Sequence, residues 1–244
     1  MSPPGRVLVT GANGFIAAYC IAELLSKGYT VVGTVRRSES VQVVLDAHQK
    51  HKGLSVLVVS DIISPTAFDS AIRGCDGVLH LAAPFSYAYD DLENDLLIPS
   101  IKGTESICIA ATKTESVKRV VLTSSFAAIY DAAKGPCPGK VYTPEDWSPL
   151  TYEDGKKGPT PVAYRASKKL AEEAAWKFVQ EKKPHWDLVT LCPGMVFGTA
   201  FPGMLQSLKS LNASNQIPWS FIDAKTVPDT KAPCELSPIQ MTSC

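Results

Sequence analysis

The chain has 244 residues, of which 45% are hydrophobic and 20% are charged, the proportions of a soluble globular protein with a buried core. Its 24 basic and 24 acidic residues cancel, which argues against a nucleic-acid or anionic membrane partner. No apolar run could span a bilayer, and the first residues lack the apolar core of a signal peptide. We therefore expect a cytoplasmic protein without a membrane partner.

Short apolar strands alternate with longer helical patterns through the first two thirds of the chain. The predicted strands cover Val7–Thr10, Thr30–Val35, Leu54–Val59, Val78–His80, Val120–Leu122 and Leu188–Leu191. The predicted helices cover Phe15–Lys27, Val41–Lys50, Ser64–Ile72, Asp91–Lys113 and Pro161–Glu181, and a loop rich in proline and glycine covers Ala132–Pro159. Because the strands are apolar throughout, the pattern predicts a doubly wound α/β fold, a parallel sheet with helices on both faces.

The alternation of strands and helices does not continue into the C-terminal part of the chain. Met204–Leu211 suggests one short amphipathic helix, and Ile217–Ala224 another turn or two. From Thr226 onward the sequence holds three prolines and no period, which predicts an irregular segment.

The cysteines favour a reducing environment. Their number is odd and no pair has C-x-x-C spacing, so we expect reduced thiols, with neither a disulfide framework nor a metal site. The seven positions are Cys20, Cys75, Cys108, Cys137, Cys192, Cys234 and Cys244. His48 and His51 could share a helix face as metal ligands, but the lysines and glutamine around them favour a solvated surface.

A glycine-rich turn lies between the first predicted strand and the first predicted helix. Gly11, Gly14 and Ala17 follow the spacing G-x-x-G-x-x-A. Gly11 would allow a tight turn, Gly14 would let the backbone approach a pyrophosphate, and Ala17 would let helix and strand pack closely. Any strand-to-helix turn can use glycine. Here, however, a strand precedes the turn, a helix follows it and a second strand ends about 20 residues later, which is the context that dinucleotide binding requires.

The end of the second predicted strand bears on the choice of cofactor. An acidic residue there would hold the ribose 2′-hydroxyl of NAD, whereas this chain has Arg36 and Arg37. A guanidinium suits the 2′-phosphate of NADP. We therefore assign Arg36 to that phosphate, expect Arg37 to be solvated, and predict NADP(H) as the cofactor. Asp61, after the third predicted strand, is placed to reach the adenine amino group or, equally, to cap the next turn.

Tyr164 and Lys168 form a Y-x-x-x-K pattern on the last predicted helix. This spacing places both side chains on one face. A cation beside the phenol would lower the pKa of Tyr164 from about 10 towards neutrality and make it a usable general acid. A lysine-rich helix also gives the pattern by chance. Lys168 with Glu172 would then be an ordinary surface pair. The same holds for Lys169 with Glu173.

Ser124 and Ser125 close the fifth predicted strand, at the carboxyl edge where such sheets bind ligands. A hydroxyl there could polarise a substrate carbonyl together with Tyr164 while a nicotinamide delivers hydride. One of the two serines is expected to form only a strand-end turn.

Several segments that occur in order carry a family resemblance. They are Thr10–Ala17, His80–Pro84, Thr123–Ser125, Tyr164–Lys168 and Cys192–Gly198. With them the chain resembles the extended short-chain dehydrogenase/reductases of the NAD-dependent epimerase/dehydratase family. Within that family it looks most like the branch of dihydroflavonol reductase, cinnamoyl-CoA reductase and the fungal methylglyoxal, aldehyde and ketone reductases. Lys102-Gly103-Thr104 and the stretch Tyr164–Glu172 look like the fungal members.

The resemblance implies roles for particular residues. Ser125 would be the catalytic serine, Tyr164 the proton donor, and Lys168 a catalytic residue that also holds the nicotinamide ribose. The implied cofactor-binding residues are Gly11, Asn13, Gly14, Phe15, Ile16, Arg36, Asp61, Ile62, Ala82, Ala83, Tyr164, Lys168, Pro193 and Val196. The implied substrate-pocket residues are Phe85, Phe126 and Met195. An aromatic ring or methionine beside a sheet edge is more often part of a core.

The resemblance covers residue 6 to about residue 226, and relatives continue well past this length. A later strand, which reads roughly F-V-D-V-R-D-V-A in relatives, is not found here. We therefore expect a C-terminally truncated member of the family. Residues 1–200 would form the NADP-binding Rossmann domain, and residues 201–244 a remnant of the substrate lobe with an irregular tail.

These inferences favour an NADPH-dependent aldehyde or ketone reductase, reversible as an alcohol dehydrogenase, with a small-molecule carbonyl or alcohol substrate. A nucleotide-sugar epimerase or dehydratase is an alternative, which Arg36 argues against because such enzymes usually retain NAD. An inactive or regulatory cofactor-binding fragment is another alternative. The substrate, the reaction direction and the oligomeric state stay open.

Overall fold

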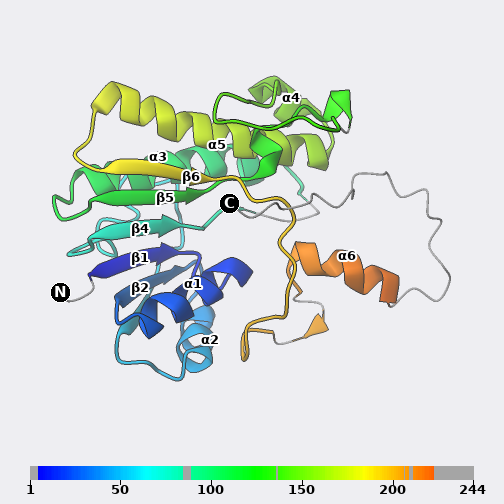
Figure 1. The fold of residues 1–244 in the computed structure, drawn as a ribbon. Helices are drawn as coiled ribbons and strands as arrows, with labels where there is room; N and C mark the ends of the chain where they lie inside the picture. The colour runs from blue at the N-terminus through cyan, green and yellow to red at the C-terminus, as the bar shows by residue number, and fades with distance from the viewer. Residues whose placement is uncertain (1–4, 85–88, 136, 206, 209–210, 223–244) are drawn as a thin grey trace.

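The fold is seen in a computed structural model that describes residues 5–84, 89–135, 137–205, 207–208 and 211–222. Within these residues, six parallel strands form one sheet in the order β3-β2-β1-β4-β5-β6 (Figure 1). The strands are β1 (Arg6–Thr10), β2 (Thr30–Val35), β3 (Leu54–Val58), β4 (Gly77–His80), β5 (Arg119–Thr123) and β6 (Asp187–Leu191). The predicted parallel α/β sheet is confirmed.

The sheet is covered, as the alternating pattern predicts, by α1 (Phe15–Ser26), α2 (Glu39–Ala47), α3 (Ile98–Thr112) and α5 (Thr160–Lys182). Two further helices are α4 (Tyr152–Lys157), which packs on α5, and α6 (Ala213–Ile222), which follows the loop after β6. In β1, Leu8 lies in an apolar cluster with residues of α3 and α5, whereas Val7 and Val9 lie in a second cluster with residues of α1 and α2. The centre of the sheet is therefore covered on both faces, which is why its strands are apolar throughout.

The strand order reverses direction between β1 and β4. The chain builds β1, β2 and β3 outward on one side, then crosses back to place β4 against the other side of β1. The loops that follow β1 and β4 therefore diverge at the carboxyl edge of the sheet. In open α/β sheets a ligand binds at such a point.

The long predicted helix at Asp91–Lys113 contains a change of helix type. A π-helical segment, η1 (Glu93–Leu97), leads directly into α3, and Pro99 stands in the first turn of α3. Proline has no N–H group to donate to the preceding turn. The wider π turn before it fits this missing hydrogen bond.

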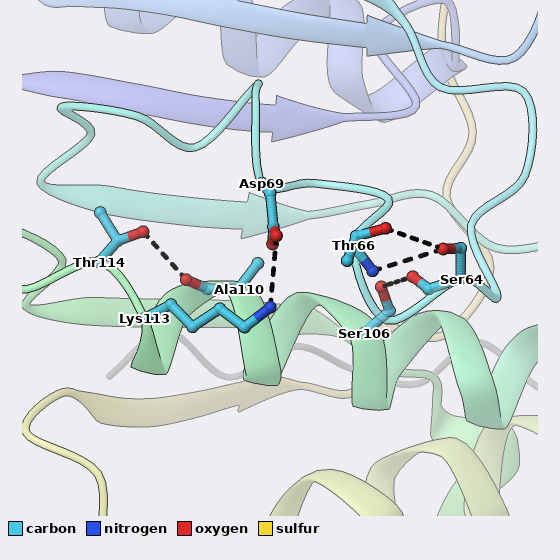
Figure 2. Close-up of polar contacts among 7 residues, drawn as sticks. All are labelled: Ser64, Thr66, Asp69, Ser106, Ala110, Lys113 and Thr114. Atoms are coloured by element: carbon cyan, nitrogen blue, oxygen red, sulfur yellow. Dashed lines mark hydrogen bonds and ion pairs between the residues drawn. The ribbon is translucent and has the colours of Figure 1, made fainter.

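The predicted helix at Ser64–Ile72 is wrong, because this stretch forms a succession of turns. The amide of Ala67 donates to the Ser64 carbonyl over three residues (3.0 Å). The Ser106 hydroxyl of α3 donates to the same carbonyl (2.6 Å), and the Ser64 and Thr66 hydroxyls lie 3.2 Å apart (Figure 2). Local side-chain hydrogen bonds and the tie to α3 offer the backbone an alternative to a helix.

The predicted loop at Ala132–Pro159 contains α4, which the sequence reasoning missed. The helix begins with a capping box, in which the Asp154 amide donates to Thr151 Oγ1 (3.2 Å) and the Thr151 amide donates to the Asp154 carboxylate (2.7 Å). The spacing T-x-x-D was the available signal. Two 3₁₀ turns, η2 (Phe126–Ala128) and η3 (Ala132–Lys134), precede it.

The predicted helix at Met204–Leu211 is not found in the described part of that stretch. Instead, a turn follows Phe201, and Gly203 adopts φ +80° where an added Cβ would lie 3.3 Å from the Ala47 Cα of α2. The close approach to α2 and the left-handed backbone conformation exclude a helix there. The expected turns from Ile217 belong to α6, and the stretch from Thr226 lies outside the described residues.

His48 is buried, contrary to the expected solvated surface. It follows α2 directly, and its ring lies 4.8 Å from the ring of Phe201, which also meets Tyr19 edge-on at 5.2 Å. Burial, followed by the charge of His51, lowers the pKa of His48. No helix in the described part of the chain is long and apolar enough to cross a membrane.

Candidate active site at the carboxyl edge of the sheet

The turn between β1 and α1 depends on glycine for two reasons. Gly11 adopts φ +67°, and an added Cβ would lie 3.0 Å from the Ala82 Cα that follows β4. The turn is closed by the Gly14 amide, which donates to the Gly11 carbonyl (2.8 Å). A side chain at Gly11 would therefore strain the backbone and push apart the loops that follow β1 and β4.

The N-terminus of α1 is suited to an anion. Gly14 is its N-cap and supplies no side-chain hydrogen bond, and the first turn contains no acidic residue. Asn13 and Gly14 are exposed, while Phe15 and Ile16 are half-buried. Exposed amide groups at a helix N-terminus, with the positive end of the helix dipole, attract phosphate. The predicted phosphate-binding residues thus lie together at the carboxyl edge.

A buried hydroxyl braces the two loops that meet here. Thr10 Oγ1 accepts hydrogen bonds from the amides of Leu81 and Ala82 (both 3.0 Å) and lies 3.0 Å from His80 Nδ1. With both its lone pairs occupied, the hydroxyl has one hydrogen to give, and it donates that hydrogen to His80 Nδ1. Ala82 and the exposed Ala83 follow at the start of the β4 loop, where the sequence analysis expects them to border the cofactor.

The expected adenosine end of the site lies at β2 and β3. Arg36 and Arg37 follow β2 and are both exposed. Asp61 accepts a hydrogen bond from the Ile63 amide (2.9 Å), the turn-capping alternative considered for it. Ile62 packs towards α3, where an added Cβ on Gly103 would lie 2.7 Å from Ile62 Cδ1.

The Lys168 side chain reaches the end of β5. Its Nζ donates to the Thr123 carbonyl (3.3 Å), and burial lowers its pKa to about 8, against the opposing effects of Cys192 and Glu172. Tyr164 lies one turn earlier on α5 and is half-buried. The predicted Tyr–Lys face of the helix therefore meets the sheet at the edge that carries Ser124 and Ser125.

The two serines have different surroundings. Ser124 is buried and donates to the Glu172 carboxylate. Ser125 is half-buried, and its Oγ accepts from the Ala127 amide (3.1 Å), which caps η2. Among the described contacts, the Ser125 hydroxyl donates to no group, so it can donate to a substrate. Both serines thus have local structural roles, but only Ser125 has a hydrogen to offer.

A small cavity of about 20 Å³ connects these groups. It is bordered by Lys168, Ser124, Ala82 and Ala83, and on the α3 side by Thr104. A space of this size accommodates one water molecule. Residues from β4, β5, α3 and α5 therefore converge on one point behind the carboxyl edge.

The loop after β6 borders Ser125 on its other side. The Phe126 amide donates to the Pro193 carbonyl (2.8 Å), while Val196 is half-buried and Met195 is 48% exposed. Met195 is thus not a core residue. Phe85, the third residue expected at the substrate pocket, lies outside the described residues.

An aromatic cluster around Phe126 was missed by the sequence reasoning. The rings of Phe126 and Tyr130 stack at 5.0 Å, and Tyr142 meets Phe126 edge-on at 4.8 Å. Arg165, the residue after Tyr164, donates from Nη1 to the Tyr130 hydroxyl (3.4 Å). Tyr142 lies in the predicted loop and Tyr130 just before it, where no periodic pattern could relate them to the site.

Comparison with known proteins places this geometry in a family. Residues 7–216 match the NAD dependent epimerase/dehydratase family. The chain belongs to this family. The sequence-based recognition of the extended short-chain dehydrogenase/reductases is confirmed.

Members of the family from fungi are similar over most of the chain. An uncharacterized oxidoreductase of Schizosaccharomyces pombe is 43% identical over 220 residues, which are 89% of this chain and 65% of that protein. The NADPH-dependent methylglyoxal reductase GRE2 of Saccharomyces cerevisiae is 40% identical over 200 residues, 79% of this chain and 58% of that protein. This chain therefore spans less than two thirds of the length of either relative.

A solved structure of the family agrees with the fold. Gre2 of Candida albicans in complex with NADPH superposes with a TM-score of 0.83 and 36% identity, covering 90% of this chain and 66% of that chain. The relatives' names thus come from the branch to which the sequence motifs pointed.

Proposed function

We propose that this chain is the cofactor-binding part of an NADPH-dependent carbonyl reductase, with Tyr164 as the proton donor. The observation that carries the proposal is the hydrogen bond from Lys168 Nζ to the Thr123 carbonyl, two residues before Ser125. It brings the face of α5 that carries Tyr164 and Lys168 to the sheet edge where the β1–α1 turn offers its amides. Relatives named as NADPH-dependent reductases support the same reading.

The residues at the edge fit a dinucleotide. The left-handed Gly11, the uncapped α1 N-terminus and the small Ala82 leave backbone accessible to a pyrophosphate. The exposed Arg36 after β2 suits a 2′-phosphate. In this proposal the remaining implied contacts are made by Asn13, Phe15, Ile16, Asp61, Ile62, Ala83, Pro193 and Val196.

The chain's own residues would handle the proton and the carbonyl oxygen. NADPH, when bound, supplies hydride. Ser125 donates a hydrogen bond to the carbonyl oxygen, and Tyr164 delivers the proton to it. Lys168, as an ammonium, stabilises the phenolate that Tyr164 leaves behind. Run in reverse, the same groups would accept a proton from an alcohol.

A small carbonyl compound, aliphatic or aromatic, is the proposed substrate class. Phe126 directly follows Ser125, and its amide donates to the Pro193 carbonyl in the loop that carries the exposed Met195. We assign Phe126 and Met195 to the substrate side together with Phe85. We further propose that residues 1–200 form the NADP-binding domain and that residues 201–244 belong to the substrate lobe. An epimerase or dehydratase is less well supported, because Arg36 favours a cofactor that enters as a reductant.

The proposal is tested by NADPH oxidation with a panel of aldehydes and ketones. Tyr164→Phe should reduce turnover by about 10²–10⁴-fold because the proton donor is lost, while NADPH affinity stays near that of the unmodified chain. Tyr152→Phe is the matched control and should retain activity. It removes a phenol of α4 that donates a hydrogen bond to Glu93 of η1 (2.9 Å). Retained activity in Tyr164→Phe would refute the assigned role. NADPH binding with no turnover in the unmodified chain would favour a non-catalytic cofactor-binding fragment.

A further inference from the structure

Glu172 is a buried carboxylate one helical turn after Lys168, and both residues border the cavity of about 20 Å³ behind the carboxyl edge. Only 4% of the residue is exposed, so the ordinary surface pair considered from the i,i+4 spacing is wrong. Its neighbour Glu173, in contrast, pairs with Lys169 (2.9 Å) and has a side chain that is 41% exposed. A carboxylate is rarely buried without partners, because desolvation of the charge is costly.

Three hydrogen-bond donors surround this carboxylate. The Ser124 hydroxyl and the Cys192 thiol (3.5 Å) donate to Oε2, and Trp176 Nε1 donates to Oε1 (3.4 Å). Ser124 follows β5 and Cys192 follows β6, so Glu172 ties the ends of both strands to α5. Each oxygen of the buried carboxylate therefore has a hydrogen-bond donor within the protein.

Other titratable groups also face Lys168 from the elements packed around it. These are Tyr164 and Glu172 from α5, His80 from β4, and Cys192 after β6. Burial, then the charge of Lys168, lowers the pKa of His80 to about 3, and burial, then Glu172, raises the pKa of Cys192 to about 11. Both groups are neutral near pH 7. Glu172 is therefore the source of negative charge among these neighbours.

We propose that Glu172 is a positioning residue whose charge keeps the half-buried Lys168 protonated and whose hydrogen bonds hold Ser124 at the end of β5. The proposal rests on the proposed function for its catalytic consequence, because it is the Lys168 ammonium that assists Tyr164. Its physical content, the coupling of Glu172 to Lys168, can be measured on the chain without cofactor or substrate.

The direct test is a pH titration of Lys168 by NMR, using isotope-labelled lysine and Lys168→Arg to assign the signal. In the unmodified chain the ammonium should titrate near pH 8. Glu172→Gln removes the negative charge, which makes the ammonium less favourable and should lower the pKa of Lys168 by about one unit. Glu173→Gln, the same change on the exposed neighbour, should leave the pKa of Lys168 unchanged.

The outcomes separate the inference from the proposed function. An unshifted titration in Glu172→Gln, or an equal shift in Glu173→Gln, would overturn the inference whether or not the chain turns over. A shift in an inactive chain would support the inference while the proposed function fails.

For an active chain, the alkaline limb of kcat/KM should move to lower pH in Glu172→Gln. A purely structural role would lower the rate at every pH without moving that limb. If Glu172→Gln does not fold, Glu172→Met removes the same charge with an apolar side chain of similar length. If neither variant folds, the role is structural and the proposal is wrong.

Discussion

The buried His80 and the half-buried Lys168 are two basic side chains that lie close enough at the carboxyl edge to affect one another. Burial and the Lys168 charge lower the pKa of His80 to about 3, so His80 is neutral and can accept the Thr10 hydrogen at Nδ1. The positive charge is thus on Lys168, one helical turn after Tyr164. The neutral His80 accepts a hydrogen bond from Thr10, which connects the loops that follow β1 and β4.

This arrangement predicts a pH dependence of stability. The pKa of His80 is depressed in the folded chain, to about 3, so the unfolded chain binds a proton first as pH falls below about 6.5. Stability is therefore full above pH 6.5 and falls between about 6.5 and 3. Between pH 7.5 and 5 the unmodified chain should lose about 2 kcal/mol more than His80→Gln, measured by urea unfolding. Equal losses in the two chains would show that His80 is not buried in its neutral form.

The sequence predicts which chemical groups lie at the site better than it predicts which side chains are buried. The glycines at Gly11 and Gly14, and the Tyr–Lys pattern of α5, lie where the sequence places them. The sequence does not distinguish Glu172 from Glu173, because one turn of helix brings either to a lysine and only the packing of β5 and β6 selects the buried one. His48 is similar, since it is buried by Phe201, a residue far along the chain.

Among the elements, α4 shows how a short helix is fixed by what it packs on. Its Gly155 is buried, and an added Cβ would lie 2.7 Å from Ala166 Cβ of α5 and 3.0 Å from Leu97 Cδ2 of η1. Glu93 of η1 also forms an ion pair with Lys156 (2.7 Å). Glycine weakens an isolated helix, but here it allows α4 to approach Ala166 of α5.

Gly155→Ala should therefore destabilise the chain. Alanine improves helix propensity by up to about 1 kcal/mol, but the contact with a rigid Cβ costs about 1–3 kcal/mol, so a net loss of about 1–2 kcal/mol is expected in denaturant unfolding. Gly77→Ala is the control, because an added Cβ there meets nothing closer than the Arg119 carbonyl at 3.6 Å. If both substitutions have the same effect, the close approach of α4 to α5 is not as described.

The central strands β1 and β2 were predictable because they are buried on both faces and so read as apolar runs. The helix predictions that are wrong concern segments whose conformation is determined by tertiary contacts. Ser64–Ile72 forms turns tied to α3 through Ser106, and the stretch after Phe201 lies against α2. In both places a helical pattern is present, but side-chain hydrogen bonds or a close backbone approach determine the conformation.

At the scale of the whole molecule, the order β3-β2-β1-β4-β5-β6 brings together residues far apart in sequence. The turn after β1, the loop after β4, the end of β5 and one face of α5 meet at one edge because all the strands are parallel. Sequence motifs identified these segments one by one, and the topology explains their convergence.

Thermal unfolding with and without NADPH tests the central claim most directly, that this edge binds NADPH. A ligand that binds only the folded chain stabilises it by about 2.7 kcal/mol at a hundredfold excess over Kd, roughly 5–10 °C in Tm for a chain of this size. We predict a cooperative transition that rises more with NADPH than with NADH, and an Arg36→Asp variant that loses this preference. A transition unmoved by NADPH, or moved equally by both cofactors in the unmodified chain, would contradict the account.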